Sequence, residues 1–578
     1  MQKQIIRREA GPGTHDFSAD LPQLLARIYS ARNVSSDREL NRQLKGLHHY
    51  TSLKGIDVAA SLLADAIIAG QNILIVGDFD CDGATSSALG VLALRAMGGN
   101  ANYLVPNRFE YGYGLTPEIV EVSRQYKPDV LVTVDNGISS IDGVAAARAE
   151  GWKVVVTDHH LAGRELPQAD AIVNPNQPDC PFPGKNTAGV GVIFYVMCAL
   201  RTELKQRGWF DTDPEFNPFE LLDLVALGTV ADVVSLDANN RILAHQGLAR
   251  IRAGRCRPGI RALIEISGRN PERLVAADLG FALGPRLNAA GRLDDMSTGI
   301  ELLITDNLNS AREIASELDS LNQERKEIES TMQQEALAEL DKLQLDDKSQ
   351  LPVGISLFRE DWHQGVVGIL ASRVKDRLNR PVIAFAESDS GQQDGDIKGS
   401  ARSIQGLHMR DALDSVAREN PGLIIKFGGH AMAAGLSIKK ADFPLFVDAF
   451  DREVRSQLSN ESLEAIILTD GELLVGDMTM ETAQMLREAG PWGQNFPEPC
   501  FDGLFQIIQQ RLVGKKHLKM VLKVPDSEFY LDAIAFNVDT QQWPNLNIST
   551  IKVVYKLDIN EYRGQTSLQL LVDYFEPA

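Results

Sequence analysis

ILIVGDFDCDG, residues 73–83, joins an apolar run to a turn that carries three aspartates. An uninterrupted run of branched apolar residues indicates a strand that is buried on both faces, as the strands of parallel sheets are. Gly83 allows the chain to turn from this strand into a helix. Asp78, Asp80 and Asp82 therefore follow the carboxyl end of a parallel strand, where ligands bind in open α/β sheets.

Three further apolar runs end in Asp or His. They are VLVTVDNGIS (130–139), VVVTDHH (154–160) and VALGTVADVV (225–234), and we interpret all of them as strand-like. From 50 to 175 the pattern alternates strands (73–77, 101–105, 130–134 and 153–157) with helices (84–97, 116–126 and 140–150). This alternation predicts a doubly wound parallel sheet. Residues 187–303 have a mainly helical pattern and would cover that sheet.

The second half of the chain changes pattern twice more. Apolar residues spaced three and four apart, without Pro or Gly, predict one helix from 307 to 345, roughly 50 Å long at 1.5 Å per residue. A pair of shorter helices broken near Asp346 is the alternative. A second α/β pattern begins after Pro352. From about residue 460, alternating apolar and polar residues predict a small barrel of the oligonucleotide-binding (OB) type.

The predicted architecture is therefore α/β with five segments. They are an N-terminal extension (1–50), a doubly wound parallel-sheet domain (51–306), a connector helix (307–347), a second α/β domain (348–458) and an OB-like β-barrel (459–578). A chain of 578 residues with 44% hydrophobic content can fill the three or four cores that this division requires.

The composition argues against a membrane protein, a secreted protein and a protein held together by disulfides or a zinc ribbon. The longest apolar run (188–200) is too short to cross a bilayer, and the amino terminus MQKQIIRREA lacks the apolar core of a signal peptide. We therefore expect a cytoplasmic protein without a membrane segment. The cysteines are odd in number and never form a CxxC pair, so we expect buried thiols and neither disulfides nor a zinc ribbon. These cysteines are Cys81, Cys180, Cys198, Cys256 and Cys500.

The net charge of −20 argues against a broad basic face that would grip duplex DNA. The acidity is unevenly spread, because residues 501–578 hold eight Lys or Arg against nine Asp or Glu. A local basic patch in the predicted barrel is compatible with this balance, and carboxylates elsewhere would be neutralised by bound metal.

The acidic turn predicts hard divalent cations, because carboxylate oxygens are the ligands that Mg²⁺ and Mn²⁺ prefer. Asp135 ends the run 130–134 and is placed to bridge two such ions. In the triplet Asp158, His159 and His160, adjacent histidines point apart, so one can bind metal while the other faces a substrate phosphate. Asp232 lies in an apolar run, where burial without a partner is costly and a metal would be that partner.

Plainer interpretations exist for each of these motifs. DxDxDG also resembles a calcium-binding loop, although the Glu that such a loop needs further along is missing. Acidic loops without metal are common, a histidine at a strand end is usually an ordinary polar residue, and Asp232 could cap the following turn. The convergence of the four segments is what favours a metal site.

Together the segments resemble the DHH phosphoesterase superfamily, and nearly the whole chain is similar to its bacterial single-strand-specific exonucleases. The resemblance is carried by DFDCDG, VDNG, DHH and GTVADVV in the first domain, by GPRLNAAGR (284–292), by GSARS and GGHAMAAG in the DHH-associated domain, and by LREAGPWGQNFPEP (486–499) beside the barrel. It implies that Asp78 supports the metal site and that His160 contacts the scissile phosphate. The metal ligands that it implies are Asp80, Asp82, Asp135, His159 and Asp232.

One position departs from the family pattern. Many relatives carry His two residues before the first Asp of the first motif, and this chain has Val76 there. We expect one of the two metal sites to be weaker as a result, so that the second ion binds only with substrate or Mg²⁺ suits the site better than Mn²⁺.

The resemblance also implies that the second domain holds the 5′ end of a single strand. Ser400 and Arg402 offer a hydroxyl and a guanidinium fork for a phosphate, and glycines of GGHAMAAG let backbone N–H groups approach an anion. Packing alone is the alternative for those glycines. The candidates for phosphate binding are Arg108, Ser400, Arg402 and His430.

In the barrel, basic residues of RLVGKKHLK could follow a phosphate backbone while aromatic residues stack on bases, although most strand aromatics serve the core. The basic candidates are Lys515, Lys516, His517 and Lys519, and the aromatic candidates are Phe529 and Tyr530.

The function we expect is a metal-dependent 5′→3′ exonuclease that degrades single-stranded DNA to mononucleotides in repair and recombination. The expected chain is a monomer, with single-strand-binding protein and a helicase as partners implied by the family. A hydrolase of short oligonucleotides or cyclic dinucleotides is the enzymatic alternative, but such relatives typically lack the connector and the barrel. A single-strand DNA-binding scaffold with weak or no activity is the other alternative, and it predicts missing ligands.

Overall fold

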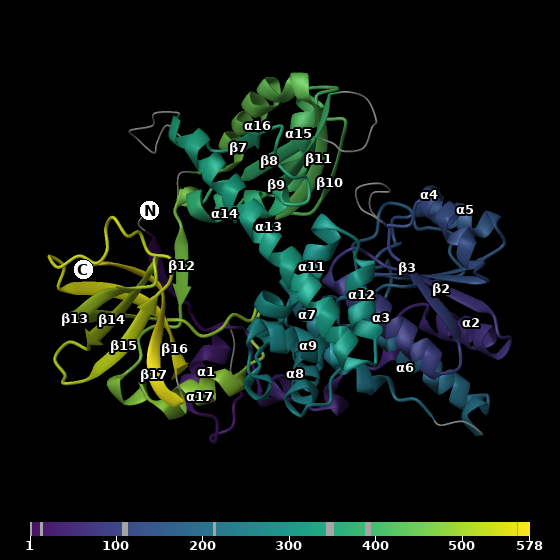
Figure 1. Cartoon of the computed structure of the whole chain (residues 1–578), viewed down its shortest axis with the longest axis horizontal. Helices are drawn as coiled ribbons and strands as arrows, with labels where there is room; N and C mark the ends of the chain where they lie inside the picture. The colour runs from purple at the N-terminus through teal and green to yellow at the C-terminus, as the bar shows by residue number, and fades with distance from the viewer. Residues whose placement is uncertain are drawn as a thin grey trace.

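The computed structural model describes residues 3–11, 16–106, 114–211, 215–342, 352–387, 395–459, 461–562 and 564–578. Figure 1 shows a parallel-sheet domain at one end of the molecule, a β-barrel at the other, and a second α/β domain set above the helices between them.

The first sheet has five parallel strands in the order β3-β2-β4-β5-β6. The chain leaves β2 toward β3 on one side and returns to β4 on the other, so ligands are expected beside the carboxyl ends of β2 and β4. The predicted strands are confirmed, and the sheet also contains β6. The strands are β2 (Asn72–Val76), β3 (Asn100–Leu104), β4 (Val130–Val134), β5 (Lys153–Thr157) and β6 (Ala171–Val173).

Helices cover both faces of this sheet, as a doubly wound fold requires. Ile73 and Ile75 of β2 pack with α2 (Ile56–Ile68), α3 (Cys81–Ala96) and α6 (Gly189–Gln206) in the largest hydrophobic core. Leu74 and Val76 point to the opposite face, where they pack with α4 (Pro117–Ser123) and α5 (Ile141–Ala149). The period of two along the strand explains this division.

Residues 222–304 are mainly helical, and one sequence prediction is wrong here. The run 225–234, interpreted as strand-like, forms α7 (Leu222–Ala231), which ends just before Asp232. Leu222–Thr229 are all buried, so the apolar residues show no helical periodicity that could distinguish helix from strand. The helices that follow are α8 (Ala238–Arg252), α9 (Pro258–Ser267), α10 (Ala276–Asp278), a π-helical turn (Leu279–Leu283), α11 (Gly284–Leu293) and α12 (Ser297–Ile304).

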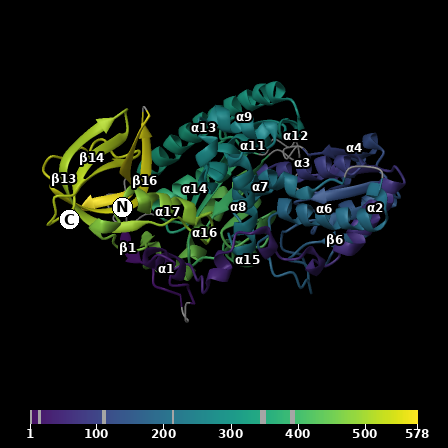
Figure 2. The ribbon, with the colours of Figure 1, turned by 90° about the horizontal axis from the view of Figure 1, so that it is seen from below.

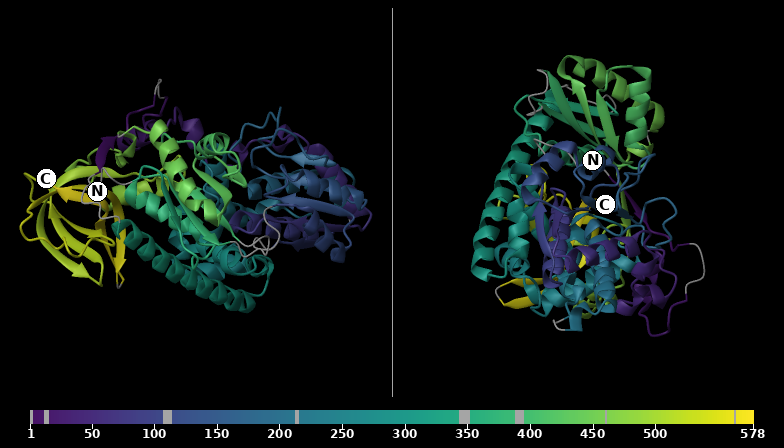
Figure 3. Two further views of the ribbon diagram at one scale, coloured as in Figure 1. Left: turned by 90° about the horizontal axis from the view of Figure 1, so that it is seen from above. Right: turned by 90° about the vertical axis from the view of Figure 1, so that its right-hand side faces the viewer.

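The predicted connector is confirmed as α13 (Leu308–Lys342), a single helix of 35 residues. Ala311, Ala315 and Leu318 lie in the core of the first domain, and Met332 and Ala336 lie in a core of the second α/β domain. The alternative break near Asp346 falls outside the described residues. Figure 3 shows this helix running along one side of the molecule from the first domain to the second.

The second α/β domain has a five-stranded mixed sheet in the order β10-β11-β9-β8-β7. Only β7 and β8 are parallel, and the other neighbours are antiparallel. Its strands are β7 (Ile355–Phe358), β8 (Val382–Glu387), β9 (Asp396–Arg402), β10 (Lys426–Gly429) and β11 (Ala433–Lys439), and its helices are α14 (Val367–Leu378), α15 (Met409–Glu419) and α16 (Phe443–Gln457).

The C-terminal strands form a closed barrel in the order β13-β14-β15-β17-β16, which confirms the predicted OB-like barrel. Closure removes the exposed sheet edges that an open sheet of this size would leave. The strands are β13 (Phe501–Val513), β14 (His517–Lys523), β15 (Tyr530–Ala535), β16 (Thr550–Tyr562) and β17 (Gln565–Pro577), and α17 (Met480–Ala489) precedes them.

The N-terminal segment packs on the C-terminal part of the chain. Strand β1 (Gln4–Arg7) pairs in parallel with β12 (Ile466–Thr469), and α1 (Gln23–Ser30) contributes Ile28 and Tyr29 to the barrel's core. The buried Arg32 guanidinium binds the carboxylate of Asp470 at 2.7 Å. Figure 2 shows β1 and α1 beside α17 and the barrel.

The composition predicted buried thiols without disulfides, and no membrane-spanning segment. Cys81, Cys180, Cys198 and Cys500 are buried and Cys256 is half-buried, and all five are free thiols. Within the described ranges, no helix combines the length and apolar character needed to span a bilayer.

Candidate metal centre and substrate pocket

The carboxylates of Asp80 and Asp82, in the turn after β2, accept hydrogen bonds from different helices. Asp80 caps the start of α3, where its carboxylate accepts the N–H groups of Asp82 and Gly83 at 2.9 and 3.0 Å. Asp82 is fully buried, and it accepts N–H groups from Gly189 and Val190 at the start of α6, at 2.6 and 3.0 Å. The partial positive charge of that helix start stabilises the buried carboxylate.

Two glycines, Gly189 and Gly228, allow helices to approach these carboxylates. Gly228 belongs to the motif GTVADVV, whereas Gly189 carries no recognisable sequence signal. A Cβ on Gly189 would lie 2.7 Å from Cβ of Asp135, and a Cβ on Gly228 would lie 2.8 Å from Oδ1 of Asp82. Any larger residue would push α6 or α7 away from the carboxyl ends of the strands. These glycines therefore bring Asp232, at the end of α7, within reach of the other acidic residues.

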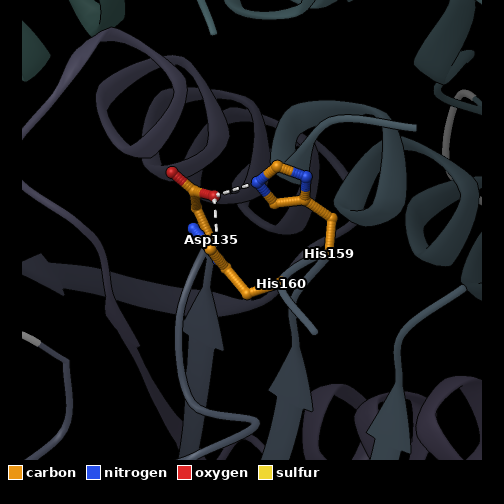
Figure 4. A group of neighbouring side chains, drawn as sticks. All are labelled: Asp135, His159 and His160. Atoms are coloured by element: carbon orange, nitrogen blue, oxygen red, sulfur yellow. Dashed lines mark ion pairs between the residues drawn. The ribbon is translucent and has the colours of Figure 1, made fainter. Parts of the chain in front are cut away.

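Asp135 and His159 are in direct contact. The Nε2 atom of His159 lies 3.0 Å from Oδ1 of Asp135 (Figure 4). The same atom lies 3.6 Å from Oδ2 of Asp232. Asp135 is almost fully buried and takes a left-handed backbone conformation, with φ of 61°. A non-glycine residue in that conformation is uncommon and is favoured at functional turns.

The two adjacent histidines differ in exposure, but the prediction that they point apart is wrong, because their ring centroids lie 4.5 Å apart and both rings approach Oδ1 of Asp135. Asp158 accepts the backbone N–H groups of Ile138, His159 and His160, and its Oδ1 also contacts Nδ1 of His160 at 2.8 Å. The side chain of His159 is 12% exposed and that of His160 is 35% exposed. His159 thus faces the buried acids, while His160 faces the more open side of the site.

Burial and charge shift the pKa values in this cluster. Burial and the neighbouring Asp80 raise the pKa of Asp82 to about 7, and burial with repulsion from Asp82 and Asp80 raises the pKa of Asp135 well above its usual range. The pKa of Asp232 is raised for the same reasons. Burial, followed by the charge of His160, lowers the pKa of His159 to about 4, which keeps its imidazole neutral.

The donor set fits divalent metal ions. Three overlapping groups of side chains have ligand atoms within 4.8 Å of one another: Asp135, His159 and His160; Asp82, His159 and Asp232; and Asp78, Asp80 and Asp135. Asp135 and His159 each belong to two of them. Carboxylates that repel one another in a buried place need a cation to be stable when ionised, and oxygen ligands with one neutral imidazole suit Mg²⁺ or Mn²⁺.

A cavity of about 450 Å³ joins this cluster to the second α/β domain. Asp78, Asp80 and His160 line it from the first domain, and Ser400 and Arg402 line it from β9 of the second. Arg402 is largely buried and donates from Nη1 to the backbone oxygen of Ala401. The structure therefore brings two of the predicted phosphate ligands beside the acidic cluster.

Of the other two candidates for phosphate binding, only His430 lies within the described residues. His430 follows β10 and is exposed, but it is close enough to His159 and His160 for their charges to affect one another, and burial with the charge of His160 lowers its pKa. Arg108 lies outside the described residues.

Sequence reasoning missed several residues of the cavity. Asn288, Arg292, Gln364 and Gly365 line it as well. Asn288 accepts the N–H of Cys81 at 2.7 Å, which fixes α11 against the acidic turn. The motif GPRLNAAGR contains Asn288 and Arg292 but does not by itself indicate what they contact, and Gln364 is an ordinary polar residue before α14 that carries no sequence signal.

Only some of the barrel residues that we predicted to bind DNA are exposed and unpaired among the contacts described below. Lys515 and Lys516 are exposed in the turn between β13 and β14, whereas Lys519 pairs with Asp532 at 3.0 Å. His517 packs edge-on against Phe536, which is 51% exposed. Tyr530 is 47% exposed, but Phe529 packs partly against the barrel core.

Comparison with known proteins agrees with this geometry. The family model described as DHH family, N-terminal domain, matches residues 72–229, the DHHA1 domain matches 350–456, and the RecJ OB domain matches 469–574. These three matches define a DHH-type phosphoesterase with an added OB barrel.

The relatives narrow the class further. "Single-stranded-DNA-specific exonuclease RecJ" of Salmonella typhimurium is 57% identical over 100% of this chain and 99% of its own length. The protein of the same name from Escherichia coli K12 is 56% identical over the full length of both chains. A solved structure of RecJ in complex with Mn²⁺ from Thermus thermophilus superimposes with a TM-score of 0.79 at 27% identity, covering 98% of this chain and 80% of that one. The chain belongs to the RecJ family.

Proposed function

We propose that the chain is a divalent-metal-dependent exonuclease that degrades single-stranded DNA from the 5′ end and releases mononucleotides. The observation that carries the proposal is the shared cavity, because its walls hold acidic metal ligands on one side and Ser400 with Arg402 on the other. A terminal phosphate bound by Arg402 would place a nearby phosphodiester over the acidic cluster. The relatives from Salmonella typhimurium and Escherichia coli are named single-stranded-DNA-specific exonucleases, which supports the class of substrate and reaction.

The chain's own side chains would divide the reaction between them. Bound divalent cations would supply an activated water and stabilise charge on the phosphate oxygens. Asp80, Asp82, Asp135, His159 and Asp232 would hold those ions, and Asp78 would support them. Asp158 orients His160 by accepting from its ring and backbone N–H groups, and His160 would contact the scissile phosphate.

Two ions fit the arrangement better than one. Asp135 belongs to two of the ligand groups, and its carboxylate, with two oxygens, could bind to two neighbouring ions, whereas the neutral imidazole of His159 would bind only one. Val76 has no side-chain atom that could bind a metal, and its side chain is fully buried in the apolar layer against α4 and α5. We expect one ion to bind weakly until a phosphate joins its ligands, so that Mn²⁺ stoichiometry measured calorimetrically rises from one toward two when an oligonucleotide is added.

The alternatives account for less of the chain. A hydrolase of short oligonucleotides or cyclic dinucleotides would leave the 35-residue connector helix and the closed barrel without a role. An inactive scaffold would have lost ligands, whereas the cluster here keeps the acidic residues and both histidines. Single-strand-binding protein and a helicase as partners, a monomeric state and a cytoplasmic location stay predictions from the sequence and the family.

The experiment that tests the function uses single strands labelled at either end. With Mg²⁺ or Mn²⁺, we expect a 5′ label to appear in mononucleotides from the start of the reaction, while a 3′ label stays on a shortening strand. Asp135→Ala should abolish both signals. Activity that survives this substitution, or that begins at the 3′ end, would contradict the proposal.

A further inference from the structure

We propose that three glycines fix the distance between the metal ligands and the phosphate-binding residues, and thereby select the phosphodiester bond that is cut. The glycines are Gly291 in α11, Gly365 just before α14, and Gly368 in its first turn. The proposal rests on the proposed function, because it takes 5′-terminal cleavage as given and concerns the register of the cut.

The first contact joins α11 to the acidic turn. A Cβ on Gly291 would lie 1.8 Å from the backbone oxygen of Phe79, which stands between Asp78 and Asp80. Real Cβ atoms do not approach backbone atoms so closely, and a backbone oxygen cannot rotate away as a side chain can. The helix therefore rests directly on the backbone that carries two of the acidic residues.

The second contact joins α11 to the other domain. A Cβ on Gly365 would lie 2.2 Å from the backbone oxygen of Arg292, the residue that follows Gly291. Arg292 also donates from Nη1 to the backbone oxygen of Gly365 at 3.2 Å. The two domains thus meet backbone to backbone at this point, with a hydrogen bond beside the contact.

The third contact reaches the phosphate-binding residues. A Cβ on Gly368 would lie 3.0 Å from Nη2 of Arg402 and 3.4 Å from Oγ of Ser400. Here the neighbours are side chains, so a substitution would displace them without moving the backbone. Gly365 and Gly368 lie three residues apart and both line the 450 Å³ cavity.

The three contacts form one continuous stack along the cavity wall. In order, its members are Phe79, Gly291, Arg292, Gly365, Gly368 and Arg402. Its two ends carry the acidic cluster and the phosphate ligands, so the stack sets the separation between them. A glycine stands at each of the three contacts, and the separation is therefore the shortest that the backbones permit. Displacement of a reacting group by about 1 Å can reduce the rate by about 100-fold, which makes such a fixed separation consequential.

Gly365→Ala is the variant that tests the stack. The substitution leaves every metal ligand in place, and the backbone at Gly365 is not in the left-handed region, so the added Cβ acts through space alone. Gly368→Ala is a milder second variant, because it meets the flexible end of Arg402. Gly476→Ala is the matched control, since a Cβ there meets nothing within 4 Å.

The substrates are 5′-phosphorylated strands whose first nucleoside is replaced by ethanediol, propanediol or butanediol. Propanediol matches the three carbons that separate successive phosphates in DNA. We expect the wild-type chain to make the first cut at least tenfold faster with propanediol than with ethanediol. Gly365→Ala should shift the optimum to butanediol and lower kcat on ordinary strands more than tenfold with little change in KM, and Gly368→Ala should shift it less.

Three results would overturn the proposal. They are equal rates of the wild-type chain on the three substrates, an unchanged preference in a folded Gly365→Ala or Gly368→Ala chain, and a shift in the Gly476→Ala control. Mn²⁺ affinity, measured calorimetrically, should be the same in all four chains. If the wild-type chain fails to cut ordinary strands from the 5′ end, the proposed function itself is wrong, and that outcome is distinct from an active enzyme without length preference.

Discussion

The Nε2 atom of His159 lies 3.0 Å from Oδ1 of Asp135. Burial lowers the pKa of His159 to about 4, so its ring is neutral at physiological pH. A neutral imidazole beside a buried carboxyl group does not form a salt bridge, and both groups are of the types that bind divalent metals. The same nitrogen also faces Asp232 at 3.6 Å.

Replacement of His159 should therefore remove activity without unfolding the chain. For His159→Ala we expect kcat on single strands to fall on the order of 100-fold or more, because charge stabilisation at the phosphate is lost. Initial rates with saturating Mn²⁺ measure this effect. His49→Ala, which changes an exposed histidine, should keep wild-type rates; equal rates in both variants would argue against a ligand role for His159.

Metal affinity should increase with pH. The pKa of Asp82 is raised to about 7, so below that pH a proton competes with the cation for the carboxylate. We expect the Kd for Mn²⁺ to decrease by up to about tenfold per pH unit for the Asp82 proton between about pH 5.5 and 7, and the raised pKa values of Asp135 and Asp232 to add to this dependence. Titration calorimetry measures it, and Asp82→Asn should make the profile shallower; a flat wild-type profile would contradict the assignment.

Stability of the metal-free chain should change in the opposite sense. A carboxyl group whose folded pKa is raised from 3.8 to about 7 binds its proton more tightly in the folded state. Its stabilising contribution is complete below about pH 4 and is lost as the pH rises through 7. We expect the Tm in EDTA, corrected with the Asp82→Asn chain, to fall over this range, and added Mn²⁺ to raise it more at pH 8 than at pH 6.

Arg402→Ala should weaken binding of 5′-phosphorylated strands in particular. A guanidinium that binds a phosphate contributes a charge-assisted hydrogen bond of about 1.5–3 kcal/mol, so KM should rise on the order of 10- to 100-fold. Strands with a 5′-hydroxyl should be affected much less. Arg418→Ala removes an exposed arginine paired with Asp414 and is the control. Equal KM changes for both strand ends would remove Arg402 from the phosphate site.

Charge reversal at the barrel turn should lower affinity for long strands only. Lys515 and Lys516 are exposed between β13 and β14. With both changed to Glu, the slope of log K against log salt for a long single strand should become shallower by about 0.7 for each phosphate that the turn no longer binds. Fluorescence anisotropy measures this slope, with Lys326→Glu on α13 as the control. An unaltered slope would place the DNA path elsewhere.

Arg32→Ala should destabilise the C-terminal part of the chain. Asp470 would lose the guanidinium that binds it at 2.7 Å and keep Arg8 at 3.3 Å, so we expect a cost below the roughly 3–5 kcal/mol of a buried charge left without any partner. Trp492, whose ring lies 5.3 Å from this guanidinium, should report unfolding at a lower urea concentration. Arg38→Ala, at an exposed position, should leave the midpoint unchanged.

Much of the site was predictable because parallel strands place their carboxyl ends along one edge. Asp78, Asp135 and His159 follow three such strands, and the sequence showed this directly. Asp232 was predicted in the right place on the wrong element, since a fully buried helix has no apolar period to distinguish it from a strand. Gly365 and Gln364 could not be predicted, because their role depends on a domain contact and not on any local pattern.

The attachment of β1 and α1 was equally hidden, since β12, α17 and the barrel, on which they pack, lie more than 400 residues away along the chain. Local periodicity carries no information about such pairings, and the sequence predicted only an extension. The register of Gln4 with Ile466 is visible in the structure alone.

That pairing has a consequence for biosynthesis. On the ribosome, the residues of β1 emerge long before β12 and the barrel with which they assemble. Ile28 and Tyr29 must therefore remain without their native packing while the catalytic domain folds, and the last domain to be translated captures the first segment. Nascent chains arrested before the barrel is complete should expose this segment to protease, and chains released at full length should protect it.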